Sequence, residues 1–206
     1  RILALSRDVV GGAAWRATSE TVAARCGRLD LAVANAGIAD ATPIEDTSLE
    51  SWRTVMATNL DGVFLTLKHT LPLIRKGGVG GAVVVVASVA GIKAERGIGA
   101  YGASKAGALH LARIAAKEGA HDKIRVNAIL PGGVETPIWK KLPLFQDLVA
   151  KAGSEHEAFT QMAVMATPLK RFATPDETAA QIAFLFSDDA ATITGAGLVA
   201  DGGYAL

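Results

Sequence analysis

Short apolar runs alternate with longer helical stretches along this chain, and that alternation limits the fold more than any other feature. The apolar runs lie at residues 29–35, 83–88 and 124–129, and the segments between them are long enough for one or more helices. A strand that is apolar throughout is buried on both faces, which is typical of a parallel sheet with helical crossovers. The pattern therefore predicts an α/β fold with a doubly wound parallel sheet in a three-layer α/β/α arrangement.

One domain is expected over residues 1–206. Half of the residues are hydrophobic and 20% are charged, which is enough apolar material for one substantial core. Residues 136–168 are interpreted as a largely helical insertion that contacts the substrate. The net charge of +1 supplies no attraction for nucleic acid or for a membrane surface, and no apolar run reaches the roughly eighteen residues of a spanning helix.

Cysteine and histidine usage favours a reducing compartment and gives no metal site. Cys26 is the single cysteine, so it forms no disulfide within the chain, and this favours a cytoplasmic protein. The histidines are scattered without the spacing of metal ligands; they are His69, His110, His121 and His156.

Tyr101 and Lys105 stand four residues apart on a predicted helix, and Ser88 ends the apolar run at 83–88. Residues four apart share one helix face, so the Lys105 ammonium can lie beside the Tyr101 phenol. A cation about 4 Å away favours the phenolate by about 4 kcal/mol at an effective dielectric of about 20, or about three pKa units. That brings a phenol near neutrality and indicates an acid/base catalyst for carbonyls. The spacing is common by chance, so the surrounding sequence has to support it.

The surrounding motifs closely resemble those of the short-chain dehydrogenase/reductase family, in the same order and at similar spacing. They lie at residues 35–37, 59–64, 88–91, 100–107 and 131–133. The resemblance runs from Asp8 to residues 201–203, with one departure, because Ala34 stands where the family usually has an Asn. Members of this family move a hydride between a nicotinamide cofactor and an alcohol or carbonyl. The resemblance implies a Rossmann-like sheet, an NAD(P)-dependent enzyme and a homotetramer.

The resemblance implies roles for four catalytic residues. Tyr101 is the general acid/base, and Lys105 together with the positive charge of an oxidised nicotinamide adjusts its pKa. Ser88 donates a hydrogen bond to the substrate oxygen. Lys105 also holds the nicotinamide ribose hydroxyls, and Asn59 binds a water that links Lys105 to solvent. Plainer alternatives stay open, since Ser88 could only cap a turn and Asn59 could only be a polar break in its helix.

Cofactor contacts are implied at the ends of two further predicted strands. Asp8, next to Val9, would hydrogen-bond the adenine, or would instead be a helix N-cap. The backbone of three residues after the next strand would pass beneath a cofactor ribose, or would form a generic turn; these are Asn35, Ala36 and Gly37.

The nicotinamide end is implied by residues that follow the strand at 124–129. Pro131 and Gly132 would form one side of the nicotinamide site. The Val134 backbone and the Thr136 hydroxyl would hold its carboxamide. A plain turn after the strand is the alternative.

Residues 2–5 are strand-like, and in the resembling family they correspond to the third strand. The first two strands and the Gly-rich turn that receives the pyrophosphate would then lie outside this sequence. The side chain that reads the ribose 2′ position would lie there too. The cofactor is therefore expected to be NAD or NADP, with NAD favoured.

The insertion has an apolar face that could close over a substrate or could equally be core packing. A secondary alcohol or ketone is the favoured substrate. A 3-oxoacyl thioester reductase is the second interpretation, in which Lys140 and Lys141 would meet an anionic carrier; the alternative is that both are solvated. A catalytically idle cofactor-binding scaffold is the third, and the presence of Ser88, Tyr101 and Lys105 together argues against it.

Overall fold

A parallel sheet forms the centre of the molecule in the computed structural model, which describes residues 2–206. Its four strands lie in the order β1-β2-β3-β4, and each neighbouring pair is parallel. The strands are β1 (Leu31–Ala34), β2 (Gly81–Val86), β3 (Ile124–Pro131) and β4 (Gly197–Ala200). The expected parallel sheet is confirmed.

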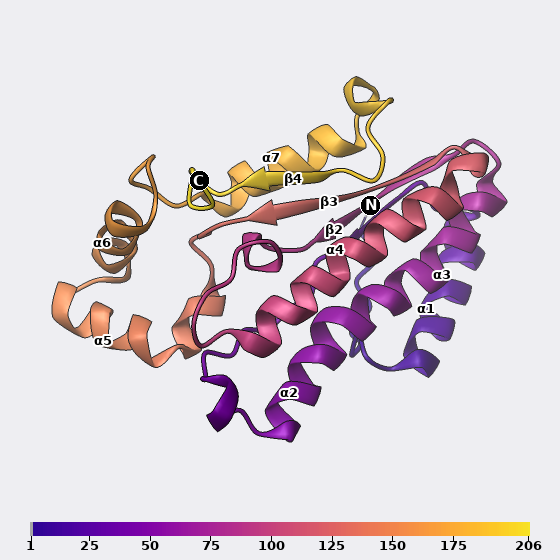
Figure 1. Cartoon of the computed structure of the whole chain (residues 1–206). Coiled ribbons are helices and arrows are strands. Elements are labelled where there is room, and N and C mark those ends of the chain that lie inside the picture. Colours follow the sequence, from indigo (N-terminus) through magenta and orange to yellow (C-terminus); the bar gives the residue numbers. More distant parts are fainter. Residues whose placement is uncertain (1) are drawn as a thin grey trace.

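Helices cover both faces of this sheet, so the doubly wound, three-layer arrangement is confirmed (Figure 1). One face carries α1 (Gly12–Cys26), α3 (Gly62–Gly77) and α4 (Gly99–Gly119), with α2 (Leu49–Met56) leading into α3. The other face carries α7 (Pro175–Phe186). Pro175 lies in the first turn of α7, where its missing N–H costs no helical hydrogen bond, and Thr174 and Glu177 form a capping box.

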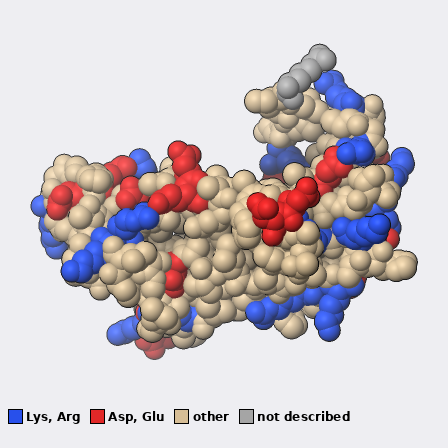
Figure 2. Space-filling view, turned by 90° about the horizontal axis from the view of Figure 1, so that it is seen from above, with Lys and Arg blue, Asp and Glu red and all other residues tan. Residues whose placement is uncertain are grey.

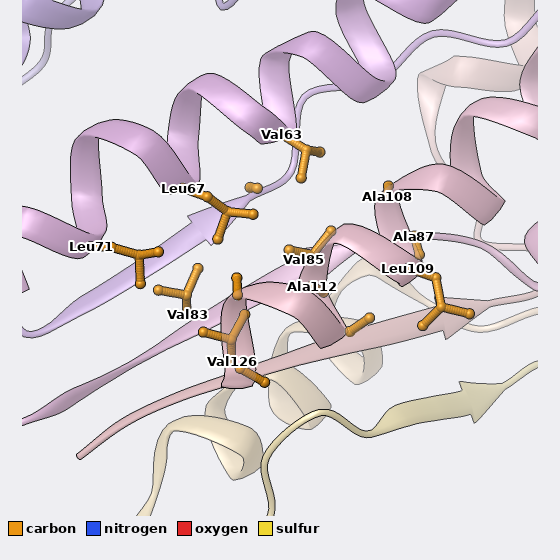
Figure 3. Packing of buried hydrophobic residues seen from close by; sticks show 14 of the residues in the cluster. Val63, Leu67, Leu71, Val83, Val85, Ala87, Ala108, Leu109, Ala112 and Val126 are labelled. Carbon is orange, nitrogen blue, oxygen red and sulfur yellow. The ribbon is translucent and has the colours of Figure 1, made fainter. Parts of the chain in front are cut away.

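Alternate residues of β2 enter two different cores, which explains why this strand is apolar at every position. Val83 and Val85 are fully buried against α3 and α4 (Figure 3). Val84 points to the opposite face and packs with Leu185 of α7. Burial on both sides fixes the strand in place, and this matters because Ser88 follows its end.

The helical region that begins with α2 has Ser48 as its N-cap. Thr47 and Glu50 have capping-box spacing, yet the side chain that accepts the helix N–H is Ser48, from the Ser51 amide. The expected break near Asn59 is present as a π-helical turn at Ala57–Asp61 between α2 and α3. A π turn inserts an extra residue, so it shifts the faces of the two helices relative to each other.

The insertion forms a helical hairpin beyond the carboxyl ends of the strands (Figure 1). A short 3-10 helix at Pro137–Lys141 precedes α5 (Pro143–Ala152) and α6 (Glu155–Ala166). These elements share an aromatic core, in which Trp139 stacks on Phe172 at 5.7 Å and Phe145 contacts Phe159 at 4.6 Å between ring centroids. Much of the apolar face noted in the sequence is therefore internal packing, whereas Leu144 and Met165 stay exposed.

Residues 2–5 are not a strand, and this expectation was wrong. They are exposed and pair with no strand of the described chain. Extended backbone joins a sheet only beside a partner that satisfies its N–H and C=O groups.

None of the helices between residues 2 and 206 combines the length and apolar character that crossing a membrane needs. Positive and negative side chains are interspersed on the face shown in Figure 2.

Candidate active site

Ser88 lies just after β2, at the carboxyl edge of the sheet, and is buried. Its hydroxyl oxygen accepts a hydrogen bond from the Ala90 amide at 3.2 Å, so it caps the short 3-10 helix Val89–Gly91. That helix packs tightly on α4, because a Cβ on Gly91 would come within 2.9 Å of the Ala106 nitrogen. Ser88 thus has the capping role of the plainer alternative, and this role also fixes its hydroxyl beside α4.

Tyr101 and Lys105 occupy the first turns of α4, on the side that faces the end of β2. The Lys105 ammonium lies 5.7 Å from the centroid of the Tyr101 ring. It donates a hydrogen bond to the Val86 carbonyl, the last residue of β2, at 2.8 Å. Lys105 is only 4% exposed, so its charge is held inside the protein between strand and helix.

Burial controls the protonation of both side chains. It lowers the pKa of Lys105 to about 8, because an ammonium loses its hydration there. Burial raises the pKa of Tyr101, and a hydrogen-bonding contact with the Ser88 hydroxyl acts in the opposite direction. In the chain without cofactor the pKa of Tyr101 is therefore above its ordinary value, because the loss of hydration outweighs the contact with Ser88. A lower pKa in the presence of Lys105 and an oxidised nicotinamide together stays a prediction.

Asn59 is completely buried in the π turn and braces the loop that follows β1. Its Oδ1 accepts from the Ile38 amide at 2.8 Å, and its Nδ2 donates to the Ile38 carbonyl at 2.9 Å. Nδ2 also donates to the Ser104 hydroxyl at 3.1 Å, and that hydroxyl donates to the Tyr101 carbonyl at 2.7 Å. The side chain of Asn59 is therefore joined to the catalytic helix through Ser104.

Gly37 brings the loop after β1 into contact with these residues. A Cβ at Gly37 would lie 3.4 Å from both the Asn59 Oδ1 and the Lys105 Nζ. The bare backbone thus leaves a narrow space in front of the ammonium, whose bond to Val86 uses one of its three N–H groups. Asn35 and Ala36 are exposed at the same edge. The cradle formed by Asn35, Ala36 and Gly37 is where the resemblance predicts a cofactor ribose, and this stays a prediction.

Asp8 and Val9 lie in the turn before α1, and their surroundings differ. Val9 contacts Gly62 and shares a hollow of about 130 Å³ with Asn35 and Ala36. Asp8 is exposed, and its carboxylate accepts from the Val10 amide at 3.1 Å. The N-cap of α1 is Gly11, so the alternative that Asp8 caps this helix was wrong.

The residues proposed for the nicotinamide end lie where β3 leaves the sheet. Pro131 ends β3, and the Gly132 amide donates to the Ala200 carbonyl at 3.2 Å. The Val134 carbonyl accepts from the Trp139 indole at 2.8 Å, which ties the insertion to this strand end. The Thr136 hydroxyl lies 3.4 Å from the same carbonyl, so it is at the edge of the insertion.

Two structural partners of the site were missed in the sequence. Ser104 connects Asn59 to the catalytic helix, and its position three residues after Tyr101 was an available signal. Gly133 lets the chain pass the Phe172 ring, since a Cβ there would lie 2.3 Å from a ring carbon. This contact joins residues 39 positions apart in the chain, and no local pattern indicates it.

In the described part of the chain, no group of three His, Cys, Asp or Glu side chains could hold a metal ion.

Comparison with known proteins gives matches over nearly the whole chain. The family model described as Enoyl-(Acyl carrier protein) reductase matches residues 2–205. Cis-4-hydroxycyclohexanecarboxylate dehydrogenase of Sinomonas cyclohexanicum is 38% identical over 205 residues, which are 99% of this chain and 77% of that protein.

Solved structures give the same picture. Carveol dehydrogenase from Mycobacterium avium, in complex with NAD, superposes with a TM-score of 0.92 at 31% identity, over 99% of this chain and 75% of that one. A short-chain type dehydrogenase/reductase from Mycobacterium marinum has a TM-score of 0.86 at 30% identity, over 98% of this chain and 75% of that one. The chain belongs to the short-chain dehydrogenase/reductase family.

Proposed function

We propose that this protein is an NAD-dependent oxidoreductase that interconverts a secondary alcohol and a ketone, with Tyr101 as general acid/base. The observation that carries the proposal is the convergence of three side chains at the carboxyl edge of β2. The phenol of Tyr101, the hydroxyl of Ser88 and the ammonium of Lys105 meet there, and Lys105 is held by the last carbonyl of the strand. Geometry of this kind serves proton transfer to a reacting C–O group.

Tyr101 exchanges a proton with the substrate oxygen. In ketone reduction the phenol donates its proton to that oxygen, and in alcohol oxidation the phenolate accepts it. The Ser88 hydroxyl donates a hydrogen bond to the same oxygen, where negative charge gathers in the transition state. Burial keeps the phenol protonated in the free protein, so the pKa of Tyr101 suits the reductive direction without further change.

A nicotinamide nucleotide would supply the hydride. Lys105 would bind the nicotinamide ribose with the N–H groups that Val86 does not use, beside the cradle of Gly37. An oxidised nicotinamide carries a positive charge, so its presence would lower the pKa of Tyr101 and help the alcohol-oxidising direction. The family neighbour with bound NAD supports NAD over NADP, and Asp8 and Val9 are proposed at the adenine end.

Asn59, Pro131, Gly132, Val134 and Thr136 complete the proposed site. The side-chain bonds of Asn59 go to Ile38 and Ser104, so a water linked to Lys105 would be bound through the Asn59 backbone. The other four residues would enclose the nicotinamide and its carboxamide, because they lie where β3 meets the insertion.

A 3-oxoacyl thioester reductase is the second candidate, favoured by the acyl-carrier wording of the matching family model. The structure offers it little electrostatic support. Lys140 pairs with Glu155 at 2.8 Å across the insertion, so its charge is already compensated within the chain. Lys141 alone is a weak site for an anionic carrier.

A cytoplasmic homotetramer is proposed as the working form. The single cysteine is in keeping with a reducing compartment. Apolar side chains remain exposed beside α2 and on α3, where a second copy would cover them; they include Ile44, Leu49, Trp52 and Phe64.

A spectrophotometric panel tests the proposal. Purified protein is incubated with secondary alcohols plus NAD or NADP, with the matching ketones plus the reduced cofactors, and with a 3-oxoacyl thioester. Cofactor absorbance reports turnover. We expect the highest kcat/KM for a secondary alcohol or ketone with NAD(H). Preference for the thioester would favour the second candidate, and no turnover with any pair would refute the proposal.

A further inference from the structure

The C-terminal turn (residues 201–206) contacts three separate segments of the chain. The first is the end of β3. Pro131 pairs with Ala200 in the sheet, and a Cβ on Gly132 would come within 2.8 Å of Asp201. The turn therefore begins against the strand end that is proposed to wall the nicotinamide.

The second segment is the end of the insertion. The Gly202 carbonyl accepts from the Leu169 amide at 3.1 Å. A Cβ on Gly203 would lie 2.8 Å from the Pro168 ring, so the Gly203 backbone packs directly on that side chain. The C-terminal turn therefore fixes the point at which the α5–α6 hairpin returns to the sheet.

The third segment is the connection between Ser88 and Tyr101, at residues 92–98. The Tyr204 hydroxyl donates to the Glu95 carboxylate at 2.7 Å. Lys93 donates to the Tyr204 carbonyl at 2.7 Å, lies 3.7 Å above the centroid of its ring and pairs with Glu95 at 3.4 Å. Three groups are thus mutually bonded across more than a hundred residues of chain.

The C-terminal turn is itself well fixed, so it can hold its partners. The Asp201 carboxylate accepts from the Gly203 amide at 2.9 Å and from the Ala205 amide at 2.8 Å. The Asp201 carbonyl also lies 3.2 Å from the Tyr204 amide. These bonds define the backbone conformation that presents the Tyr204 ring to Lys93.

The two catalytic ends of the 92–98 connection are anchored without Tyr204. Ser88 is fixed by the Ala90 amide and by the packing of Gly91 on α4. Tyr101 is fixed by its place in α4, where Ser104 bonds its carbonyl. A change confined to residues 92–98 can therefore leave Ser88 and Tyr101 in place.

Building on the proposed function, we propose that Tyr204 is a positioning residue for substrate. Its bonds to Glu95 and Lys93 hold the 92–98 connection as one wall of the substrate cleft, opposite the insertion. In this arrangement the C terminus sets substrate affinity and not the rate of hydride transfer.

The test compares Tyr204→Phe with the control Leu206→Ala, whose side chain is fully exposed on the same turn. Loss of one hydrogen bond of ordinary strength predicts a rise in substrate KM of about threefold to tenfold in Tyr204→Phe. The kcat and the cofactor Kd stay within about twofold of wild type, because Ser88, Tyr101 and Lys105 are held independently. Glu95→Gln keeps an acceptor oxygen and retains the wild-type KM, whereas Glu95→Ala gives the KM of Tyr204→Phe.

The double variant Tyr204→Phe/Glu95→Ala is no worse than either single variant if the two side chains act through one bond. Additive effects, an unchanged KM, or a fall in kcat at constant KM would overturn the proposal. Amide hydrogen exchange provides a readout that needs no turnover. We expect the exchange rate of residues 92–98 to rise in Tyr204→Phe and to stay at the wild-type value in Leu206→Ala. Equal exchange in the two variants would overturn the proposal. This readout is independent of the proposed function, because it requires no enzymatic activity.

Discussion

Replacing Lys105 with Met tests whether a charge is buried beside Tyr101. The pKa of Lys105 drops from its ordinary 10.5 to about 8 in the folded protein. This drop corresponds to about 3 kcal/mol of destabilisation at neutral pH, at about 1.4 kcal/mol per pKa unit. Met fills a similar volume and carries no charge, so it removes the titration and also the bond to the Val86 carbonyl.

The sign follows from proton binding in the two states. Between about pH 8 and about pH 10.5 Lys105 is largely neutral in the folded protein and largely protonated in the unfolded chain. The unfolded state then binds more protons, so stability rises with pH in this range. From about pH 7 to about pH 10 this single residue adds about 2 to 3 kcal/mol to the free energy of unfolding.

Urea denaturation at these two pH values measures the effect. The gain on going to high pH should be smaller in Lys105→Met than in wild type by about 2 to 3 kcal/mol. Lys151→Met is the control, because Lys151 is exposed on α5, and it should keep the wild-type gain. Burial raises the pKa of Tyr101 above its ordinary value of 10.0, and this phenol is present in all three proteins. An equal gain in wild type and Lys105→Met would refute the buried charge.

Two further variants probe the surroundings of the catalytic helix. Ser88→Ala should lower kcat by about 10²- to 10³-fold, because it removes a donor to the reacting oxygen; steady-state kinetics on the best substrate measures this, and an unchanged kcat would leave Ser88 with only its capping role. Asn59→Leu should lower the free energy of unfolding by about 1 to 3 kcal/mol, because it leaves the part-buried Ile38 amide and carbonyl without their partner; urea denaturation measures this, and wild-type stability would contradict the bracing role of Asn59.

Much of the architecture could be predicted from local patterns. Val83 to Val86 are apolar at every position because α4 and α7 cover the two faces of β2, and this burial is visible as a continuous run. Tyr101 and Lys105 were placed on one helix face by spacing alone, and the structure puts both against the end of that strand.

The remainder depends on contacts between distant segments. Tyr204 donates a hydrogen bond to Glu95, which lies 109 residues away in the chain, and no local sequence pattern indicates this pairing. Residues 2–5 have the apolar composition of a strand, but composition does not supply the neighbour that a strand needs. Burial of the Tyr101 phenol raises its pKa in the chain without cofactor, and residue spacing could not predict this because only the fold determines burial.

Tyr101→Phe, assayed for both turnover and cofactor binding, tests the central claim most directly. Phe keeps the ring in α4 and removes only the oxygen that exchanges a proton with the substrate. The account predicts a fall in kcat of about 10²- to 10⁴-fold, with a cofactor Kd within about twofold of wild type because Lys105 and Gly37 are untouched. Full turnover in this variant would contradict the account.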